Sequence, residues 1–232
     1  MTTLSKNARI AGALYILFSI FGVVRLLYIP THLFVQGNAT ATASNIAAHE
    51  MLFRFGIFSY LIGAAGWLFV TLALYRLLKG VDESLAALMV ILGSLVVVPI
   101  FFLNALNDAG ALLFARSTDF LSVFDKPQRD AFVLLFLRLH HLGDAANEIF
   151  WGLWLIPLGL LVYKSRLLPR ILGIWLMLGC LGYLALSSTA FLFPQYEDAA
   201  FTYTQPLTLS ELAFMLWLVV MGAKEKTLAA KT

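Results

Sequence analysis

Long apolar stretches alternate with short polar segments along the whole chain. Three of these stretches, Phe55–Leu74, Leu85–Leu103 and Ile171–Phe193, contain no charged residue. Each has the roughly 20 residues that an α-helix needs to cross the hydrocarbon core of a bilayer. A fourth stretch, Ile10–Ile29, is interrupted only by Arg25. The pattern predicts an all-α, polytopic membrane helix bundle.

Two further stretches reach spanning length only when they include acidic residues. Ile149–Tyr163 must be extended back to Leu139, and Leu212–Ala223 must be extended back to Leu207, which takes in Glu211. We include both and predict six transmembrane helices in a single integral membrane domain over residues 1–232. The approximate spans are 10–29, 55–78, 85–107, 139–163, 170–193 and 207–223.

The basic residues predict the orientation of the bundle, because Lys and Arg are enriched in the cytoplasmic loops of membrane proteins. The short loop Lys164-Ser165-Arg166 is basic, whereas residues 193–206 contain neither Lys nor Arg. With the N-terminus inside, most of the Lys and Arg residues fall on the cytoplasmic side. We therefore expect the N- and C-termini to be cytoplasmic.

Composition agrees with a membrane protein. Hydrophobic residues make up 61% of the chain and charged residues 12%, against about 45–50% and 25% in soluble proteins. The mean hydropathy is +0.87. The net charge of +3 reflects basic residues at helix ends and does not indicate a nucleic-acid partner. The single cysteine, Cys180, excludes an internal disulfide and lies in an apolar stretch, where we expect it to pack.

The extended fourth span carries most of the candidate chemistry. Five polar residues of this segment share one face of a helix: His140, His141, Asp144, Asn147 and Glu148. With a rise of 1.5 Å per residue, Asp144 lies roughly 8 Å and Glu148 roughly 13 Å below a helix end at Leu139. Short acidic side chains do not reach the membrane surface from that depth, and a charge at mid-membrane costs about 2.5–3.5 kcal/mol unless it is paired or hydrated.

Other spans place polar residues at the same outer level. These residues are Arg25, His49, Glu50, Arg54, Asn104, Asn107, Asp108 and Glu211. Glu50 and Arg54 are four residues apart with the acid first, which favours an ion pair on a helix. The distribution predicts a polar cavity in the outer half of the bundle, open to the periplasm or the outer leaflet.

Two interpretations of these polar residues do not involve catalysis. In the structural one, Arg25 and Arg54 neutralise Asp144, Glu148 or Glu211 and fix the helix packing. In the other, the basic residues hold a small anionic or lipid-like ligand, and the carboxylates relay protons for binding or transport. We prefer the second interpretation as a working hypothesis.

A third interpretation is a metal-dependent intramembrane hydrolase. His141, Asp144 and Glu148 share a face and are weak candidates for metal ligands, with a metal-bound water as the nucleophile. The chain contains no H-E-x-x-H, G-x-S-x-G or G-x-G-x-x-G motif and no P-loop. The sequence therefore identifies no cofactor and no substrate.

Local signals predict several helix ends. A helix is expected to begin near Ser44 or Asn45, both good N-cap residues, and to continue through the second span. Asp125-Lys126-Pro127-Gln128 is typical of a helix start. The apolar run Ala131–Leu137 that follows lies at the interface or extends the fourth span, and Gly143 is a candidate kink.

Several segments are similar to those of a known family. They are Arg9-Ile10-Ala11-Gly12-Ala13-Leu14-Tyr15, the run from Thr42 to Glu50, Phe150-Trp151-Gly152-Leu153-Trp154-Leu155-Ile156-Pro157-Leu158-Gly159, and the close from Ser210-Glu211-Leu212 to Gly222. Over about residues 7–223 the chain resembles the bacterial membrane family known as domain of unknown function 4386. The resemblance implies a multi-pass membrane protein of bacterial type, and it implies no catalytic residues. We expect a bacterial cytoplasmic membrane as the location and membrane lipids as partners.

Overall fold

The computed structural model describes residues 2–224, and every regular element in that range is helical. The α-helices are α1 (Thr3–Val23), α2 (Ile29–Leu33), α3 (Ala39–Ala48), α4 (Glu50–Leu78), α5 (Glu83–Val90), α6 (Val97–Ala115), α7 (Lys126–Leu153), α8 (Leu155–Ser165), α9 (Arg170–Leu192) and α10 (Glu197–Val220). Short π-helical turns cover Val24–Tyr28 and Ile91–Leu95, and 3₁₀ turns cover Asp119–Leu121 and Pro194–Tyr196.

Within residues 2–224, five helical stretches are long and apolar enough to cross a membrane. They are Thr3–Leu33, Glu50–Leu78, Glu83–Ala115, Lys126–Ser165 and Arg170–Leu192, and they correspond to the first five predicted spans. Most of the sixth predicted span, residues 207–223, lies in α10, which is not among these stretches. The first half of α10 carries Glu197, Asp198 and Gln205, which lower its apolar character. These helices indicate a multi-pass membrane protein.

The described residues group into two compact units. Unit 1 comprises residues 2–17, 66–97 and 145–224, and unit 2 comprises residues 18–65 and 98–144. Helices α1, α4, α6 and α7 contribute residues to both units. That the whole chain forms a single integral membrane domain stays a prediction.

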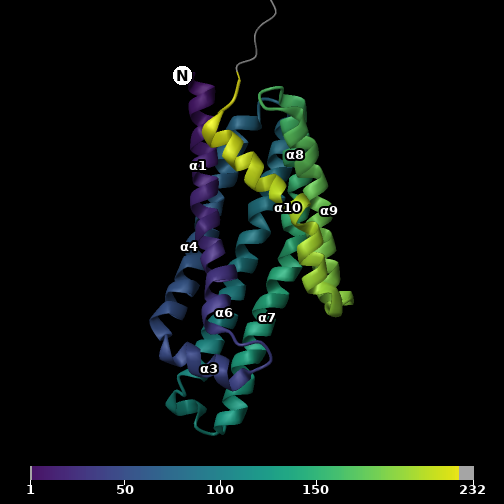
Figure 1. The fold of residues 1–232 in the computed structure, drawn as a ribbon. Helices are drawn as coiled ribbons and strands as arrows, with labels where there is room; N and C mark the ends of the chain where they lie inside the picture. Colours follow the sequence, from purple (N-terminus) through teal and green to yellow (C-terminus); the bar gives the residue numbers. More distant parts are fainter. Residues whose placement is uncertain (1, 225–232) are drawn as a thin grey trace, which may run out of the picture. The chain divides into compact units, whose positions relative to one another are not determined.

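In unit 1, α9 packs against both α8 and α10 (Figure 1). The helices α8 and α9 approach so closely that a Cβ atom on Gly159 would lie only 2.6 Å from the carbonyl oxygen of Gly173. Small residues at such crossings let helix backbones pack tightly in membranes. At the loop before α5, Lys164 Nζ lies 3.2 Å from Asp82 Oδ2, which ties that loop to the end of α8.

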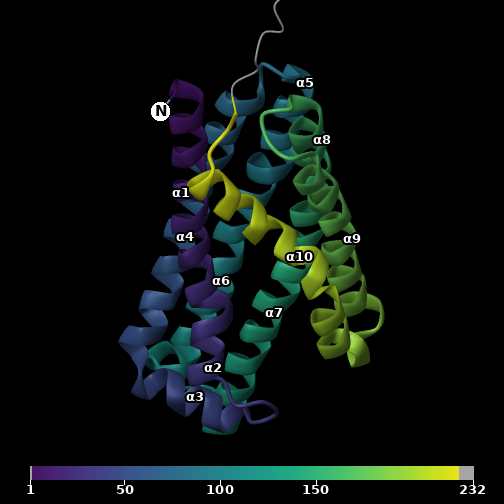
Figure 2. The same ribbon diagram turned by 45° about the horizontal axis from the view of Figure 1, so that its top comes forward.

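In unit 2, α2 and α3 lie side by side (Figure 2). Thr42 Oγ1 accepts a hydrogen bond from the Val35 amide at 2.9 Å, and Asn45 Nδ2 donates to the Leu33 carbonyl at 3.1 Å. These bonds hold the connection between the two helices against an apolar core. The core consists of Ile29, Leu33, Ala43, Ile46, Phe53, Ala111, Leu112, Val133 and Leu137.

The predicted helix start near Ser44 or Asn45 is wrong. Helix α3 begins at Ala39, where the Asn38 side chain accepts a hydrogen bond from the Ala41 amide at 2.9 Å. Asn38 is as good a cap as the later residues, so the cap signal alone did not identify the first helical residue. The helical run does not continue into the second span, because it is interrupted at His49 before α4 begins.

The predicted start of the helix after Asp125 is confirmed. Asp125 Oδ1 accepts from the Gln128 amide at 2.8 Å, and Gln128 Oε1 accepts from the Asp125 amide at 2.9 Å. This reciprocal pair is a capping box at the beginning of α7. Residues 131–137 therefore extend the helix of the fourth span, and α7 continues through Gly143 without interruption.

Candidate functional site: a buried charge cluster

The centre of the candidate site is a buried ion pair between Arg25 and Asp108. Arg25 Nε donates to Asp108 Oδ2 at 2.7 Å, and Nη2 donates to Oδ1 at 2.5 Å. The two side chains are 3% and 0% exposed. Arg25 lies in the π-helical turn that follows α1, and Asp108 lies in α6. The bidentate geometry is the strongest pairing available to an arginine and a carboxylate.

His140 connects this pair to a second carboxylate. Its Nδ1 lies 3.2 Å from Asp108 Oδ1, and its Nε2 lies 3.1 Å from Asp144 Oδ2. Neither contact is aligned as a linear hydrogen bond, although both are within the distance of an ion pair. The imidazole is 3% exposed. One ring therefore bridges a carboxylate of α6 and a carboxylate one turn further along α7.

Asp144 is held in place by a tyrosine and an asparagine. The Tyr60 hydroxyl donates to Asp144 Oδ1 at 2.5 Å, and Asn104 Nδ2 donates to the same oxygen at 3.0 Å. Asn104 Nδ2 also donates to the His140 carbonyl at 2.8 Å, and Asn107 donates to Asn104 Oδ1 at 2.9 Å. We call Arg25, Tyr60, Asn104, Asp108, His140 and Asp144 the buried charge cluster.

Gly143 makes room for this arrangement. A Cβ atom at that position would lie 2.5 Å from Asn104 Oδ1, which is closer than real Cβ atoms come to a neighbour. The glycine thus lets Asn104 approach the backbone of α7 and reach the His140 carbonyl. Its role is close approach between α6 and α7, and the helix remains continuous there.

Aromatic rings surround the cluster. The guanidinium carbon of Arg25 lies 5.6 Å from the centroid of Phe34 and 6.0 Å from that of Phe53. The Tyr60 ring lies 5.1 Å from the imidazole of His140 and meets Phe101 edge-on at 4.9 Å. Apolar walls exclude water, so the charges interact in a medium of low dielectric constant. In such a medium the attraction between paired charges is strong, and a charge without a partner is costly.

The charges of the cluster do not balance without an additional proton. One arginine and two aspartates sum to −1 when His140 is neutral, and to zero when His140 carries a proton. A buried site strongly disfavours an uncompensated charge. The arrangement is therefore suited to holding one proton between two carboxylates and an imidazole.

Unit 1 contains a separate buried carboxylate. Both oxygens of Glu211 in α10 accept hydrogen bonds from phenols, Oε1 from Tyr15 and Oε2 from Tyr183, the latter at 2.5 Å. The Tyr15 ring is in edge contact with Trp67 at 5.0 Å and packs 6.0 Å from Trp154. The two tyrosines therefore give each carboxylate oxygen a neutral donor in an aromatic environment.

A family model described as Domain of unknown function (DUF4386) matches residues 10–222. The chain belongs to this family. The matched range contains every residue of the buried charge cluster and also Glu211. The resemblance carried by the four sequence segments is confirmed.

A relative of this DUF4386 chain comes from Archaeoglobus fulgidus and carries the name "Uncharacterized protein". The two are 30% identical over 155 residues, which are 67% of this chain and 76% of the relative. No solved structure matches the chain. Since this relative is archaeal, the bacterial origin implied by the resemblance stays a prediction.

Several predicted site residues of the DUF4386 chain lie together in unit 2. The structure brings Arg25, Asn104, Asp108, His140 and Asp144 into contact, with Asn107 bonded to their edge. Sequence reasoning missed Tyr60, because a tyrosine in an apolar span is typical of aromatic packing. The residues one turn before and after it on the same helix face, Gly56 and Ala64, are small and apolar and do not indicate a polar partner.

The remaining predicted residues lie outside the buried charge cluster. Glu50 pairs with Arg54 at 2.6 Å, as the spacing predicts, and His49 is exposed at the junction of α3 and α4. His141 is exposed, whereas His140 is buried. Asn147 in unit 1 is buried, with Nδ2 3.5 Å from the Val97 carbonyl, and its Oδ1 has no hydrogen-bond partner among the described residues.

The suggested metal ligands do not form a recognisable metal centre. Within residues 2–224, no group of three or more His, Cys, Asp and Glu side chains is arranged to hold a metal ion. His141 is exposed while Asp144 is buried with Tyr60 and Asn104. The interpretation as a metal-dependent hydrolase gains no support from the geometry.

Proposed function

We propose that the protein is a transport-related, ligand-binding membrane protein whose buried charge cluster binds one proton. The observation that carries this proposal is the bridge from Asp108 through His140 to Asp144, with Arg25 on one carboxylate. Binding and release of the proton at His140 would change the net charge of the cluster between zero and −1. Such a change alters the attraction between α6 and α7 and thereby couples proton binding to helix movement.

A purely structural role explains the cluster less well. The Arg25–Asp108 pair alone is neutral and would be sufficient to join the turn after α1 to α6. The addition of a second buried carboxylate, Asp144, introduces a charge that costs several kcal/mol unless it is compensated. Ionisable residues inside membrane segments mark proton relays and substrate pathways in pumps and transporters. The second carboxylate and the bridging imidazole therefore favour a functional role.

The proposal includes six spans, with both termini in the cytoplasm of a bacterial cell and the cluster towards the outer side. Helix α10 has 24 residues, which is long enough to cross a bilayer, and its acidic Glu211 is satisfied by Tyr15 and Tyr183. The basic loop Lys164–Arg166 supports the orientation. Reporter fusions after residue 224 test it: an extracytoplasmic reporter signal would contradict the proposed topology.

The proton is tested directly by nuclear magnetic resonance of protein labelled with ¹⁵N in its four histidines. We expect one doubly protonated imidazolium signal at neutral pH that is missing in His140→Gln and present in His141→Gln. The exposed neighbour His141 is the matched control, because the same chemical change is made one residue away. A neutral His140 signal in the wild-type protein would overturn the proposed proton site.

Coupling to transport is tested in proteoliposomes that contain a trapped pH-sensitive dye. An imposed inside-negative membrane potential should acidify vesicles with the wild-type protein or His141→Gln, and it should fail to acidify vesicles with His140→Gln. Equal acidification by the wild-type protein and His140→Gln would show that protons move by another route. If the wild-type protein does not acidify the vesicles, it does not conduct protons. The resonance experiment then decides alone whether the cluster binds a proton.

A further inference from the structure

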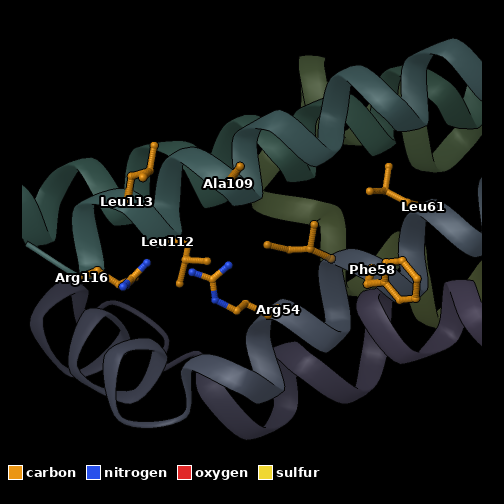
Figure 3. Close-up of a pocket in the computed structure, with 8 residues that line it drawn as sticks. Arg54, Phe58, Leu61, Ala109, Leu112, Leu113 and Arg116 are labelled. Carbon is orange, nitrogen blue, oxygen red and sulfur yellow. The ribbon is translucent and has the colours of Figure 1, made fainter. Parts of the chain in front are cut away.

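A groove of about 330 Å³ lies between α4 and α6 of unit 2 (Figure 3). Both of its walls are largely apolar, with Ile57, Phe58 and Leu61 from α4 and Ala109, Leu112 and Leu113 from α6. Phe58 is 62% exposed and Leu113 is 43% exposed, so the groove opens outward from the helices. Both helices belong to stretches long and apolar enough to cross a membrane. Lipid chains are therefore the natural surroundings of this groove.

Two arginines lie at one end of the groove. Arg54 comes from α4 and Arg116 directly follows α6, and Figure 3 shows both side chains extending into the space beside Leu112. Both arginines contact the same carboxylate, Glu50, with Nε distances of 2.6 Å for Arg54 and 3.2 Å for Arg116. Both arginine side chains are 43% exposed. Two guanidinium groups on one carboxylate leave a net charge of +1 at this end.

The charged end and the apolar end are separated along the helix axis. Arg54 is in the second turn of α4 and Leu61 is seven residues later, which corresponds to about 10 Å of helix. Arg116 lies just beyond the end of α6, so both arginines are at the margin of their apolar stretches. Arginines at this level meet the head-group region of a bilayer, while the remainder of the groove lies at the depth of acyl chains.

We propose that this groove binds an anionic phospholipid of the surrounding bilayer. The lipid phosphate would pair with Arg54 and Arg116, and the first part of one acyl chain would lie along Phe58, Leu61 and Ala109. Guanidinium groups suit phosphate because their planar donors form two parallel hydrogen bonds to it. Glu50 occupies the position of the anion when the lipid is absent, so its carboxylate competes with the phosphate. This site is separate from the proton-binding cluster and does not depend on it.

The test is native mass spectrometry of the full chain in a non-ionic detergent with added phosphatidylglycerol. We expect Arg54→Gln and Arg116→Gln each to weaken lipid retention roughly fivefold, and the double variant to lose both contributions. Arg76→Gln is the matched control, since it removes the same charge from an exposed position of the same helix α4. Equal retention by the wild-type protein and the double variant would overturn the proposal.

Two variants distinguish lipid binding from loss of folding. Glu50→Gln should increase phosphatidylglycerol retention, because it removes the competing carboxylate and leaves both arginines; an unfolded protein would not gain affinity. Ala109→Phe should reduce retention while keeping every charge, because the ring fills the apolar part of the groove. Unchanged retention in either variant contradicts the assignment.

The choice of probe separates a lipid from a free anion. Phosphatidylcholine should be retained more weakly than phosphatidylglycerol, and inorganic phosphate at millimolar concentration should not displace the bound lipid. Equal retention of the two lipids would show that the arginines do not select a net negative head group. Displacement by phosphate alone would show that the arginines hold an anion without a contribution from the acyl chain, which would also overturn the proposal.

Discussion

Asp144 follows His140 by one helical turn, and its Oδ2 lies 3.1 Å from the imidazole Nε2 of that histidine. The opposite nitrogen of the same ring lies 3.2 Å from Asp108. A single side chain of α7 thus joins two carboxylates, only one of which has an arginine partner at hydrogen-bonding distance. We therefore expect loss of the arginine pair to affect the protein differently from loss of the proton proposed for His140.

Asp108→Asn should destabilise the protein by about 3–5 kcal/mol, because it leaves the Arg25 guanidinium buried without a counterion. Replacement of both partners, Arg25→Met with Asp108→Leu, should recover a large part of that loss, since neither charge then remains buried. Reversible unfolding in mixed detergent micelles measures both. If the double variant is as unstable as Asp108→Asn, an unpaired charge is not the cause.

The exposed ion pair of unit 2 supplies the control for this measurement. Glu50→Gln removes one charge from a pair at 2.6 Å, as Asp108→Asn does, but the Glu50 side chain is 30% exposed. Solvent screens exposed pairs, whose contributions are typically about 0–1 kcal/mol. The contrast between the two variants therefore isolates the effect of burial.

Tyr15→Phe should destabilise the protein by about 1–3 kcal/mol, because it removes a donor to the buried carboxylate Glu211. Tyr183→Phe should have an effect of similar size, since its hydroxyl donates to the other oxygen. Adding Glu211→Gln to either variant should reduce the loss, because a neutral amide needs less compensation than a carboxylate. Thermal unfolding in detergent compares the variants. A loss that is unchanged in the Gln background would assign the effect to packing of the ring.

The stability of the loop before α5 should depend on pH through Asp82. The Leu85 amide, which the Asp82 side chain caps at 3.1 Å, and then Lys164 lower the pKa of this carboxyl below its usual value. A lowered pKa means that the stabilisation is fully present above the usual aspartate pKa of about 3.9 and is lost as pH falls through the lower folded-state value.

The comparison of wild type with Asp82→Asn checks this dependence. Asparagine retains the cap but cannot titrate or pair with Lys164, so the stability difference between the two proteins should shrink as the pH falls below about 4 and disappear below the lowered pKa of Asp82. Unfolding at a series of pH values provides the measurement. Lys164→Gln should move the loss to higher pH, because it removes one cause of the lowered pKa. A stability difference that is independent of pH would contradict the assignment to Asp82.

Local features of this fold were predictable from the sequence, and relationships between helices were less so. The capping box at Asp125 and the Glu50–Arg54 pair depend only on residues three or four positions apart. By contrast, the partner of Arg25 is Asp108, and not one of the acidic residues of the later spans. An apolar pattern identifies a span but leaves its rotation about its own axis open, so it does not determine which polar residues meet.

The π-helical turn at Val24–Tyr28 changes the rotation of the first span about its axis. It contains Arg25, and the Ile29 amide there bonds to the Val24 carbonyl five residues earlier, so the chain after it is rotated relative to a regular helix. No residue type in this stretch indicates the change of winding. Tyr60 was missed for a related reason, because its hydroxyl becomes a donor to Asp144 only once the two helices are packed.

Gly143→Ala tests whether the close approach of α6 and α7 is required. The added Cβ would lie 2.5 Å from Asn104 Oδ1, so Asn104 must move away from Asp144 and the His140 carbonyl. We expect a loss of about 1–3 kcal/mol. Gly22→Ala is the control, because a Cβ there meets nothing within 4 Å and alanine is the better helix former by about 0.5–1 kcal/mol. Unfolding in detergent should therefore show opposite signs for the two substitutions.

A second change identifies the cause of the Gly143→Ala effect. Asn104→Ala in the same chain removes the atoms that the new Cβ would contact, so the double variant should lose less stability than the sum of the two single variants. The histidine resonances provide an independent readout, because displacement of Asn104 also frees the carboxylate beside His140. Additive losses with an unchanged His140 signal would mean that Gly143 serves the helix backbone alone, and the cluster would then not depend on this contact.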